Sequence, residues 1–142
     1  MEIRPPQTEI EWQAYYDLRF RVLREPLGKE RGSEKNEGDE LGTHFAVFDT
    51  STIVAIARLD KVGSSTCQVR FVAVESNLQG KGVGKKLMSN VEEFGKKAGF
   101  SNMVLHARDY ALPFYQKIGY ELIGPSYKLF DVLQHFEMRK EL

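Results

Sequence analysis

The chain has 142 residues, a hydrophobic fraction of 42%, a charged fraction of 28% and one cysteine, Cys67. These values predict one domain over residues 1–142 and exclude an intrachain disulfide or a cysteine-ligated metal centre. Lys plus Arg equals Asp plus Glu at 20 each, so no overall charge favours nucleic acid or an anionic membrane as a partner. The sequence contains neither a bilayer-spanning apolar run nor a secretory signal, so we expect a soluble, cytoplasmic protein.

An amphipathic helix is expected near the amino terminus. Apolar residues recur near helical spacing from residue 9 to residue 25, and Pro26 ends the pattern. The helix carries Arg19, Arg21 and Arg24, of which the last two share one helical face. Beside a bound molecule these arginines would favour an acidic substrate, but a solvated charged face is the commoner meaning of such a pattern.

The stretch after this helix, residues 28–42, is polar, charged and rich in glycine. Residues 29–40 contain no side chain that resembles a core residue. We therefore predict a long mobile loop. A loop of this length either covers a substrate or is a plain surface excursion.

Three β-branched and aromatic runs follow, at residues 44–48, 52–59 and 67–74. Short turns separate them, which predicts an antiparallel meander. The third run alternates apolar and polar residues until Val72 and Val74 make its end apolar on both faces. That end is either buried or covered by a ligand.

The second half of the chain predicts a long helix over residues 83–99, a strand at 102–107 and a short helix at 111–118. Two further strands, at residues 120–123 and 135–139, complete the sheet. A strand, a long helix and another strand in succession require a parallel crossover. The expected fold class is therefore α+β, with helices around one mixed sheet.

The segment from Gln79 to Lys85 joins the meander to the long helix and contains three glycines. Glycine lets a backbone approach a ligand closely, and the first turn of a helix offers unpaired amide donors to an anion. Lys81 and Lys85 add positive charge, so the segment predicts a pyrophosphate site. The spacing fits neither a Walker A loop nor a dinucleotide fingerprint. A glycine-rich turn that binds no ligand is the alternative.

Two motifs resemble a known family. Gln79-x-x-Gly82-x-Gly84 resembles the first signature of the GCN5-related N-acetyltransferase (GNAT) family, and Ala111 to Tyr120 resembles its second, an alanine followed by Phe-Tyr and a Gly-aromatic pair. The order and spacing of the two motifs also match the family. Features such as Arg58-Leu59 and His135-x-x-Met138 are similar to the branch typified by ElaA-like proteins.

The resemblance implies a GNAT-like fold, with a mostly antiparallel central sheet, flanking helices and a splayed pair of neighbouring strands. It implies acetyl-CoA as co-substrate, no metal, and direct attack by a primary amine in a ternary complex. Backbone amides near Val72 and Val74 would hold pantetheine and the thioester oxygen. The pyrophosphate would lie on the remaining cofactor-binding residues, namely Gln79, Gly80, Lys81, Gly82, Val83, Gly84 and Lys85.

The acceptor is expected to be a small-molecule or peptide amine, without nucleic acid or membrane as a partner. A monomer and a homodimer both stay open. A non-catalytic CoA-binding sensor or regulatory module is the main alternative to an enzyme, and a structural adaptor without CoA affinity is another.

Three residues are candidates for proton transfer. Tyr115 matches the family tyrosine that protonates the departing thiolate, and its ordinary pKa near 10 lets it stay protonated. Glu75 and His106 are candidate general bases, although a solvated carboxylate and a structural histidine are the commoner roles. No histidine pair has metal-ligand spacing. Many relatives have asparagine where this chain has Arg108, which puts in doubt the contact assigned to that asparagine.

Overall fold

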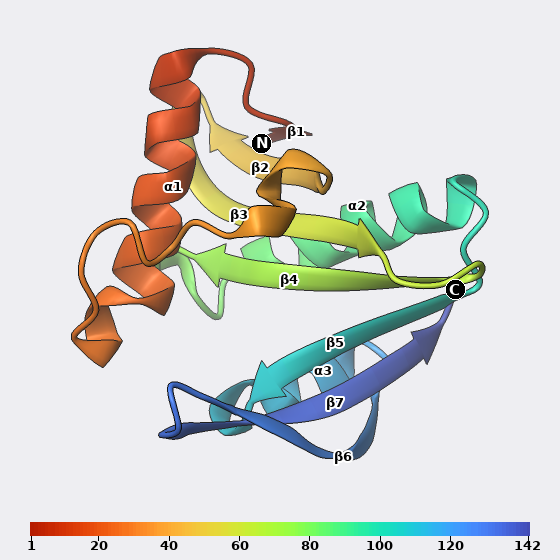
Figure 1. Ribbon diagram of the computed structural model, residues 1–142. Helices are drawn as coiled ribbons and strands as arrows, with labels where there is room; N and C mark the ends of the chain where they lie inside the picture. Colours follow the sequence, from red (N-terminus) through yellow and green to blue (C-terminus); the bar gives the residue numbers. More distant parts are fainter.

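The computed structural model describes all residues, 1–142, and centres on a seven-stranded sheet in the order β1-β2-β3-β4-β5-β7-β6 (Figure 1). The strands are β1 (Glu2–Arg4), β2 (Thr43–Asp49), β3 (Thr52–Lys61), β4 (Thr66–Val74), β5 (Asn102–Arg108), β6 (Glu121–Leu129) and β7 (Leu133–Glu141). Every neighbouring pair is antiparallel except β4 and β5. The predicted α+β fold with a mixed, mostly antiparallel sheet is confirmed.

Helices cover both faces of this sheet (Figure 1). They are α1 (Glu9–Leu23), α2 (Val83–Lys97) and α3 (Leu112–Lys117), with short 3₁₀ turns η1 (Glu25–Leu27), η2 (Glu37–Glu40), η3 (Ser76–Leu78) and η4 (Asp109–Ala111). α1 begins at a capping box, because the Thr8 side chain accepts from the Glu11 amide while the Glu11 carboxylate accepts from the Thr8 amide. None of the helices is long and apolar enough to cross a membrane.

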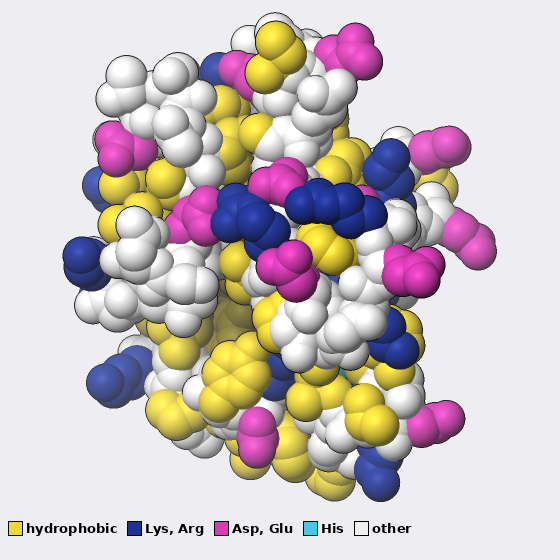
Figure 2. Space-filling view, turned by 90° about the vertical axis from the view of Figure 1, so that its left-hand side faces the viewer, with side chains coloured by type: hydrophobic (Ala, Val, Ile, Leu, Met, Phe, Trp, Pro, Cys, Tyr) yellow, Lys and Arg dark blue, Asp and Glu magenta, His cyan; other side chains and the backbone are white.

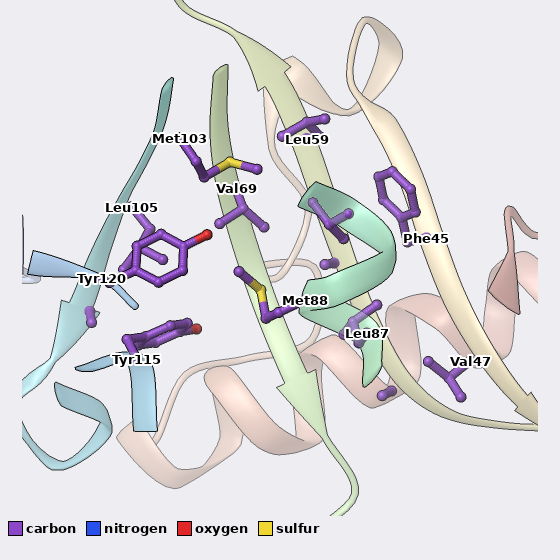
Figure 3. Close-up of a cluster of buried hydrophobic side chains, with 14 of the residues drawn as sticks. Phe45, Val47, Leu59, Val69, Leu87, Met88, Met103, Leu105, Tyr115 and Tyr120 are labelled. Carbon is purple, nitrogen blue, oxygen red and sulfur yellow. The ribbon is translucent and has the colours of Figure 1, made fainter. Parts of the chain in front are cut away.

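The larger core lies between the sheet and α2, on what we call the α2 face (Figure 3). The apolar stripe of α2 predicted from the sequence is buried there, through Val83, Leu87, Met88 and Val91. Cys67 belongs to the same cluster of 18 buried residues. Burial raises the pKa of the Cys67 thiol to about 11, so the thiol is unreactive near neutral pH.

The opposite face, which we call the α1 face, has a smaller apolar cluster of seven buried residues, including Tyr15 and Leu18 of α1. Beside it lie Arg19 and Arg58, each with no solvent exposure. Buried guanidinium groups require partners, because an isolated charge in an apolar interior is costly. This face is therefore closed by polar contacts as well as by hydrophobic packing.

β4 and β5 pair only at their beginnings and then diverge (Figure 1). Their register runs from Thr66↔Asn102 to Gln68↔Val104 and no further. Opposite β3, the pairing skips at Phe71, whose φ of 56° marks a bulge in β4. Beyond Gln68, the backbone groups of β4 that point toward β5 therefore have no neighbouring strand. This is the splayed pair that the family resemblance implied.

Several expected elements differ from those observed. β1 was missed because three residues before Pro5-Pro6 show no periodicity. β6 extends to Leu129 rather than ending at Ile123, since bulges let the strand continue through Gly124 and Pro125. Such residues normally interrupt a strand.

The prediction of a long mobile loop without core residues was wrong for the part nearest the sheet. Glu34 is buried, and the Asp39 carboxylate, with an exposed fraction of 9%, accepts from Arg19 and from Arg58. The expectation of a solvated arginine face on α1 was also wrong. Arg19 and Arg24 are buried, and Arg21 forms an ion pair with Glu75.

Candidate functional site

A cavity of about 640 Å³ occupies the splay between β4 and β5. Figure 2 shows a hollow, lined mainly by hydrophobic side chains, on the side of the molecule toward which the splay opens. Its lining comes from both faces of the sheet: α2 and α3 on one side, and the end of α1 on the other. The size is within the range of small-molecule and cofactor sites.

Most of the predicted coenzyme-binding residues line this cavity. They are Val72, Val74, Gln79, Gly80, Gly82, Gly84 and Lys85. Lys81 and Val83 do not line it, and the Val83 side chain is instead buried in the α2-face core. For Val83, only the backbone amide remains available to a ligand.

The glycine turn leaves the start of α2 uncapped. Gly82 is the N-cap residue with φ of 86°, a conformation that favours glycine, and no side chain caps the helix. The amides of the first helical turn thus lack intrahelical partners, next to the positive end of the helix dipole. An anion in the cavity can use both.

Gly84 also has a packing role. A side chain there would meet the Phe114 ring at 3.2 Å, so glycine allows α3 to pack against the first turn of α2. Gln79 is also turned toward the protein, because its Nε2 donates to the Val74 carbonyl at 3.1 Å. This bond fixes the glycine turn against the end of β4.

Tyr115 is buried on α3 and lines the cavity, with its ring next to Tyr120 at a centroid distance of 5.7 Å (Figure 3). Burial raises the pKa of the Tyr115 phenol well above its ordinary value. The Tyr120 hydroxyl donates to Glu92 at 2.8 Å, whereas the Tyr115 hydroxyl makes no hydrogen bond within the chain. Tyr115 is therefore a protonated donor free to serve a bound ligand.

His106 approaches the cavity from the other face. Its neighbours Leu105 and Ala107 belong to the α2-face core, so alternation along β5 directs His106 and Arg108 toward the α1 face. Its Nδ1 lies 2.9 Å from the Ser126 hydroxyl. Burial and, to a lesser extent, Arg70 and Arg139 lower the pKa of His106, although Glu137 opposes them. The imidazole is therefore neutral at pH 7.

Glu75, the other candidate base, lies outside the cavity. Its two carboxylate oxygens accept from Arg21 at 2.8 Å each. This ion pair lowers the pKa of Glu75 and so makes it a weaker proton acceptor. The geometry therefore disfavours Glu75 as a base, whereas His106 lines the cavity.

Three arginines of the cavity were not assigned to the site from the sequence. Arg24 ends α1, Arg70 lies on β4, and Arg108 lies on β5; all three line the cavity. Two signals in the sequence pointed toward them, namely the cluster of arginines in α1 and Arg108 at the position where many relatives have asparagine. Arg70 joins them only through the register of distant strands.

The α1 face of the site is held by a buried polar network. Arg19 donates to both oxygens of Asp39 at 2.9 and 3.0 Å, and Arg58 donates to Asp39 at 2.8 Å and to Asp60 at 2.7 Å. Arg19 also donates to the Tyr15 hydroxyl at 3.1 Å, which is 2.7 Å from His44 Nδ1. The network thus ties the end of the 28–42 segment to α1 and β3.

Comparison with known proteins shows the family of the chain. The family model described as acetyltransferase (GNAT) domain matches residues 17–142. The chain belongs to the GNAT acetyltransferase family. It is an acyltransferase with a GNAT fold, as the two sequence motifs predicted.

Individual relatives of this GNAT chain match over nearly its whole length. It is 28% identical to the uncharacterized protein YyaT of Bacillus subtilis, over 100% of this chain and 97% of that protein. The structure of ElaA from Escherichia coli has a TM-score of 0.82 at 22% identity, covering 99% of both chains. An acetyltransferase of Bacillus subtilis, solved in complex with CoA, has a TM-score of 0.78 at 20% identity, covering 99% and 98% of the chains. These structures share the fold.

Proposed function

We propose that this protein is an N-acetyltransferase that transfers the acetyl group of acetyl-CoA directly to a primary amine in a ternary complex. The observation that carries the proposal is one cavity that passes through the sheet, with the glycine turn and Tyr115 on the α2 face and His106 on the α1 face. The coenzyme and the amine can therefore meet in the splay from opposite sides. The similarity to a structure solved with CoA supports this assignment of the α2-face end.

Each group of cavity residues would have its own role in this reaction. The first-turn amides of α2, with Lys85, would hold the pyrophosphate, and the unpaired backbone of β4 near Val72 and Val74 would hold pantetheine. Bound acetyl-CoA supplies a thioester carbonyl to the attacking amine. The new C–N bond replaces the C–S bond, so one proton must leave nitrogen and one must reach sulfur.

In the proposed mechanism, Tyr115 and His106 carry these two proton transfers. Tyr115 donates its phenolic proton on the coenzyme side, which its raised pKa allows because the phenol stays protonated. His106 accepts the proton of the amine on the acceptor side through Nε2, with Nδ1 donating to Ser126. Its lowered pKa keeps it neutral and able to accept.

Calorimetric titration with acetyl-CoA tests the coenzyme site, with pantetheine as a ligand that lacks the pyrophosphate. We expect acetyl-CoA to bind and pantetheine to bind at least ~10-fold more weakly, because it cannot use the amides of α2. Equal affinity for the two ligands would contradict the site.

Replacing Tyr115 by Phe separates an enzyme from a CoA-binding sensor. In an enzyme the change should lower kcat by a factor of about 10 or more while acetyl-CoA affinity stays within about 2-fold. Unchanged turnover would remove Tyr115 as the acid. Coenzyme binding without acetylation of any amine in a broad panel would favour the sensor.

A further inference from the structure

The charge of the cavity is one-sided. Of the 28 residues that line it, five are Lys or Arg and none is Asp or Glu. Lys85 and Lys117 belong to α2 and α3, on the coenzyme side of the sheet. Arg24, Arg70 and Arg108 lie on the α1 face, across the sheet from the glycine turn. This separation leaves the three arginines without a role in binding the pyrophosphate.

The three guanidinium groups converge at the acceptor end. Arg24 Nη1 and Arg108 Nη2 both donate to the Leu23 carbonyl oxygen, at 3.2 and 3.0 Å. Arg24 and Arg70 both lie over the Phe71 ring, 5.7 and 5.1 Å from its centroid. Like charges are thus gathered around Arg24, and burial together with the repulsion of Arg108 lowers the pKa of Arg24.

No carboxylate neutralises this group. Arg24 is only 9% exposed, yet it bonds solely to the carbonyl oxygens of Leu23 and Ser33, and its Nη2 has no partner in the chain. Arg108 bonds to the Leu23 carbonyl and to the Tyr110 hydroxyl.

Arg70 is the only one of the three with a carboxylate nearby. The closest contact is from Arg70 Nη1 to Asp60 at 4.0 Å, whereas Arg58 holds both oxygens of Asp60 at 2.7 and 2.9 Å. Buried charges are normally paired, so the buried Arg24, with the partly exposed Arg70 and Arg108 beside it, forms a site that an external anion would complete.

We propose that the amine acceptor carries a carboxylate, and that Arg24, with Arg70 and Arg108, binds it. The inference rests on the proposed acetyl transfer and names the class of its acceptor. A guanidinium group matches the planar geometry of a carboxylate and binds it through two parallel hydrogen bonds. A carboxylate would also relieve the repulsion around Arg24.

The same charges act on the amine. Nearby cations lower the pKa of an ammonium group, so more of the acceptor is present as the neutral nucleophile. An amino acid with an uncharged side chain has no net charge and enters without net repulsion, whereas a polyamine with several ammonium groups is repelled. The site therefore selects amino carboxylates over polycationic amines.

Matched acceptor pairs test the inference. The purified protein would be assayed with β-alanine and β-alaninamide, 4-aminobutyrate and 4-aminobutyramide, and lysine and lysinamide, with 3-aminopropylphosphonate as a phosphate-like anion. We expect kcat/KM to be at least ~10-fold higher for the carboxylate of at least one pair. Equal or higher values for all three carboxamides overturn the inference, as does a preference for the phosphonate over every carboxylate.

Variants connect this preference to the arginines. Arg24→Gln should lower kcat/KM for the preferred carboxylate by ~10- to 100-fold, while the rate with its carboxamide and the acetyl-CoA affinity stay within about 2-fold. A structural role for Arg24 would lower both rates together. Arg31→Gln removes an exposed arginine outside the cavity and should change neither. Arg108→Gln gives the same test if Arg24→Gln does not fold.

A direct binding measurement separates this inference from the proposed function. If acetyl-CoA binds but no amine is acetylated, the proposed transfer fails, and the same compounds are then titrated calorimetrically into the coenzyme-loaded protein. Binding of a carboxylate but not of its carboxamide, lost in Arg24→Gln, would keep the anion site. If none of the carboxylates binds, the anion site is overturned as well.

Discussion

The two faces of the sheet are covered through different interactions, hydrophobic packing on one and buried ion pairs on the other. On the α2 face, 18 buried residues form an apolar core whose helix contributes an uninterrupted stripe of hydrophobic side chains. On the α1 face, seven apolar residues lie beside the fully buried Arg19 and Arg58, both held by Asp39. The coenzyme end of the cavity is thus built on hydrophobic packing, and the acceptor end on charge. This division predicts different responses to mutation and to pH.

Asp39→Ala should have the largest effect, because it leaves Arg19 and Arg58 without their shared carboxylate. Breaking one side of a buried ion pair costs about 3–5 kcal/mol of unfolding free energy, to be measured by urea denaturation. Asp17→Ala is the matched control, since Asp17 pairs with Arg21 and Arg31 at the surface and such pairs contribute less than about 1 kcal/mol. Similar losses in the two variants would show that the α1-face network is not what holds that face.

Leu87→Ala probes the α2 face. Leu87 is fully buried, so we expect the free energy of unfolding to fall by about 3 kcal/mol, from lost burial and the cavity that remains. Because no charge is involved, the loss should be the same at low and high salt. Lys86→Ala, an exposed neighbour on the helix, should stay within about 0.5 kcal/mol of the parent. A strongly salt-dependent loss in Leu87→Ala would contradict the contrast between the faces.

Gly84→Leu should weaken the coenzyme end of the cavity without unfolding the chain. A side chain at this position meets Phe114 at 3.2 Å, so the leucine must displace that ring or enter the cavity. We expect the acetyl-CoA dissociation constant to rise about 10-fold, equivalent to about 1.4 kcal/mol, as measured by calorimetry. Gly84→Ala should have a smaller effect, and undiminished binding by the leucine variant would place the coenzyme elsewhere.

His44→Gln tests the pH dependence of the α1 face. Burial is the main cause that lowers the pKa of His44, with Arg19 and Arg58 adding to it, while the backbone and side chain of Asp39 oppose it. The unfolded state therefore binds more protons below about pH 6.5, and stability is lost as the pH falls through that value. The variant should lose less unfolding free energy than the parent between about pH 7 and pH 5, by about 1 kcal/mol. Equal losses would assign the acid sensitivity to other groups.

The contrast between the faces also decides how much could be predicted from the sequence. The stripe on α2, the β-branched meander and the glycine turn are local patterns. Each predicted its own element, and the glycine turn also predicted the proposed coenzyme end of the site. Tyr115 and His106, the proposed acid and base, were candidates because a motif and a predicted strand contained them, and both line the cavity. Element boundaries such as the end of β6 depended on bulges at Gly124 and Pro125, for which a local pattern gives no signal.

The α1 face could not be predicted in the same way. Arg19, Asp39 and Arg58 are far apart in the sequence. A charged residue taken by itself indicates a solvent-exposed position. The burial of each residue depends on the other two, since a buried charge is stable only beside its partners. The same holds for Glu75, whose pairing with Arg21 across 54 positions lowers its pKa and makes it a weaker candidate base.

Two glycines restrict how the acceptor end can be redesigned. A Cβ at Gly38 would lie 2.7 Å from an Arg58 nitrogen, and one at Gly42 would lie 2.5 Å from an Arg58 carbon. The chain around Asp39 can therefore follow only one path past that arginine. Gly28 and Gly32 have no such neighbours. Libraries aimed at new acceptors should accordingly vary residues 29–31 and keep unchanged both Ser33, whose carbonyl accepts from Arg24, and residues 36–42.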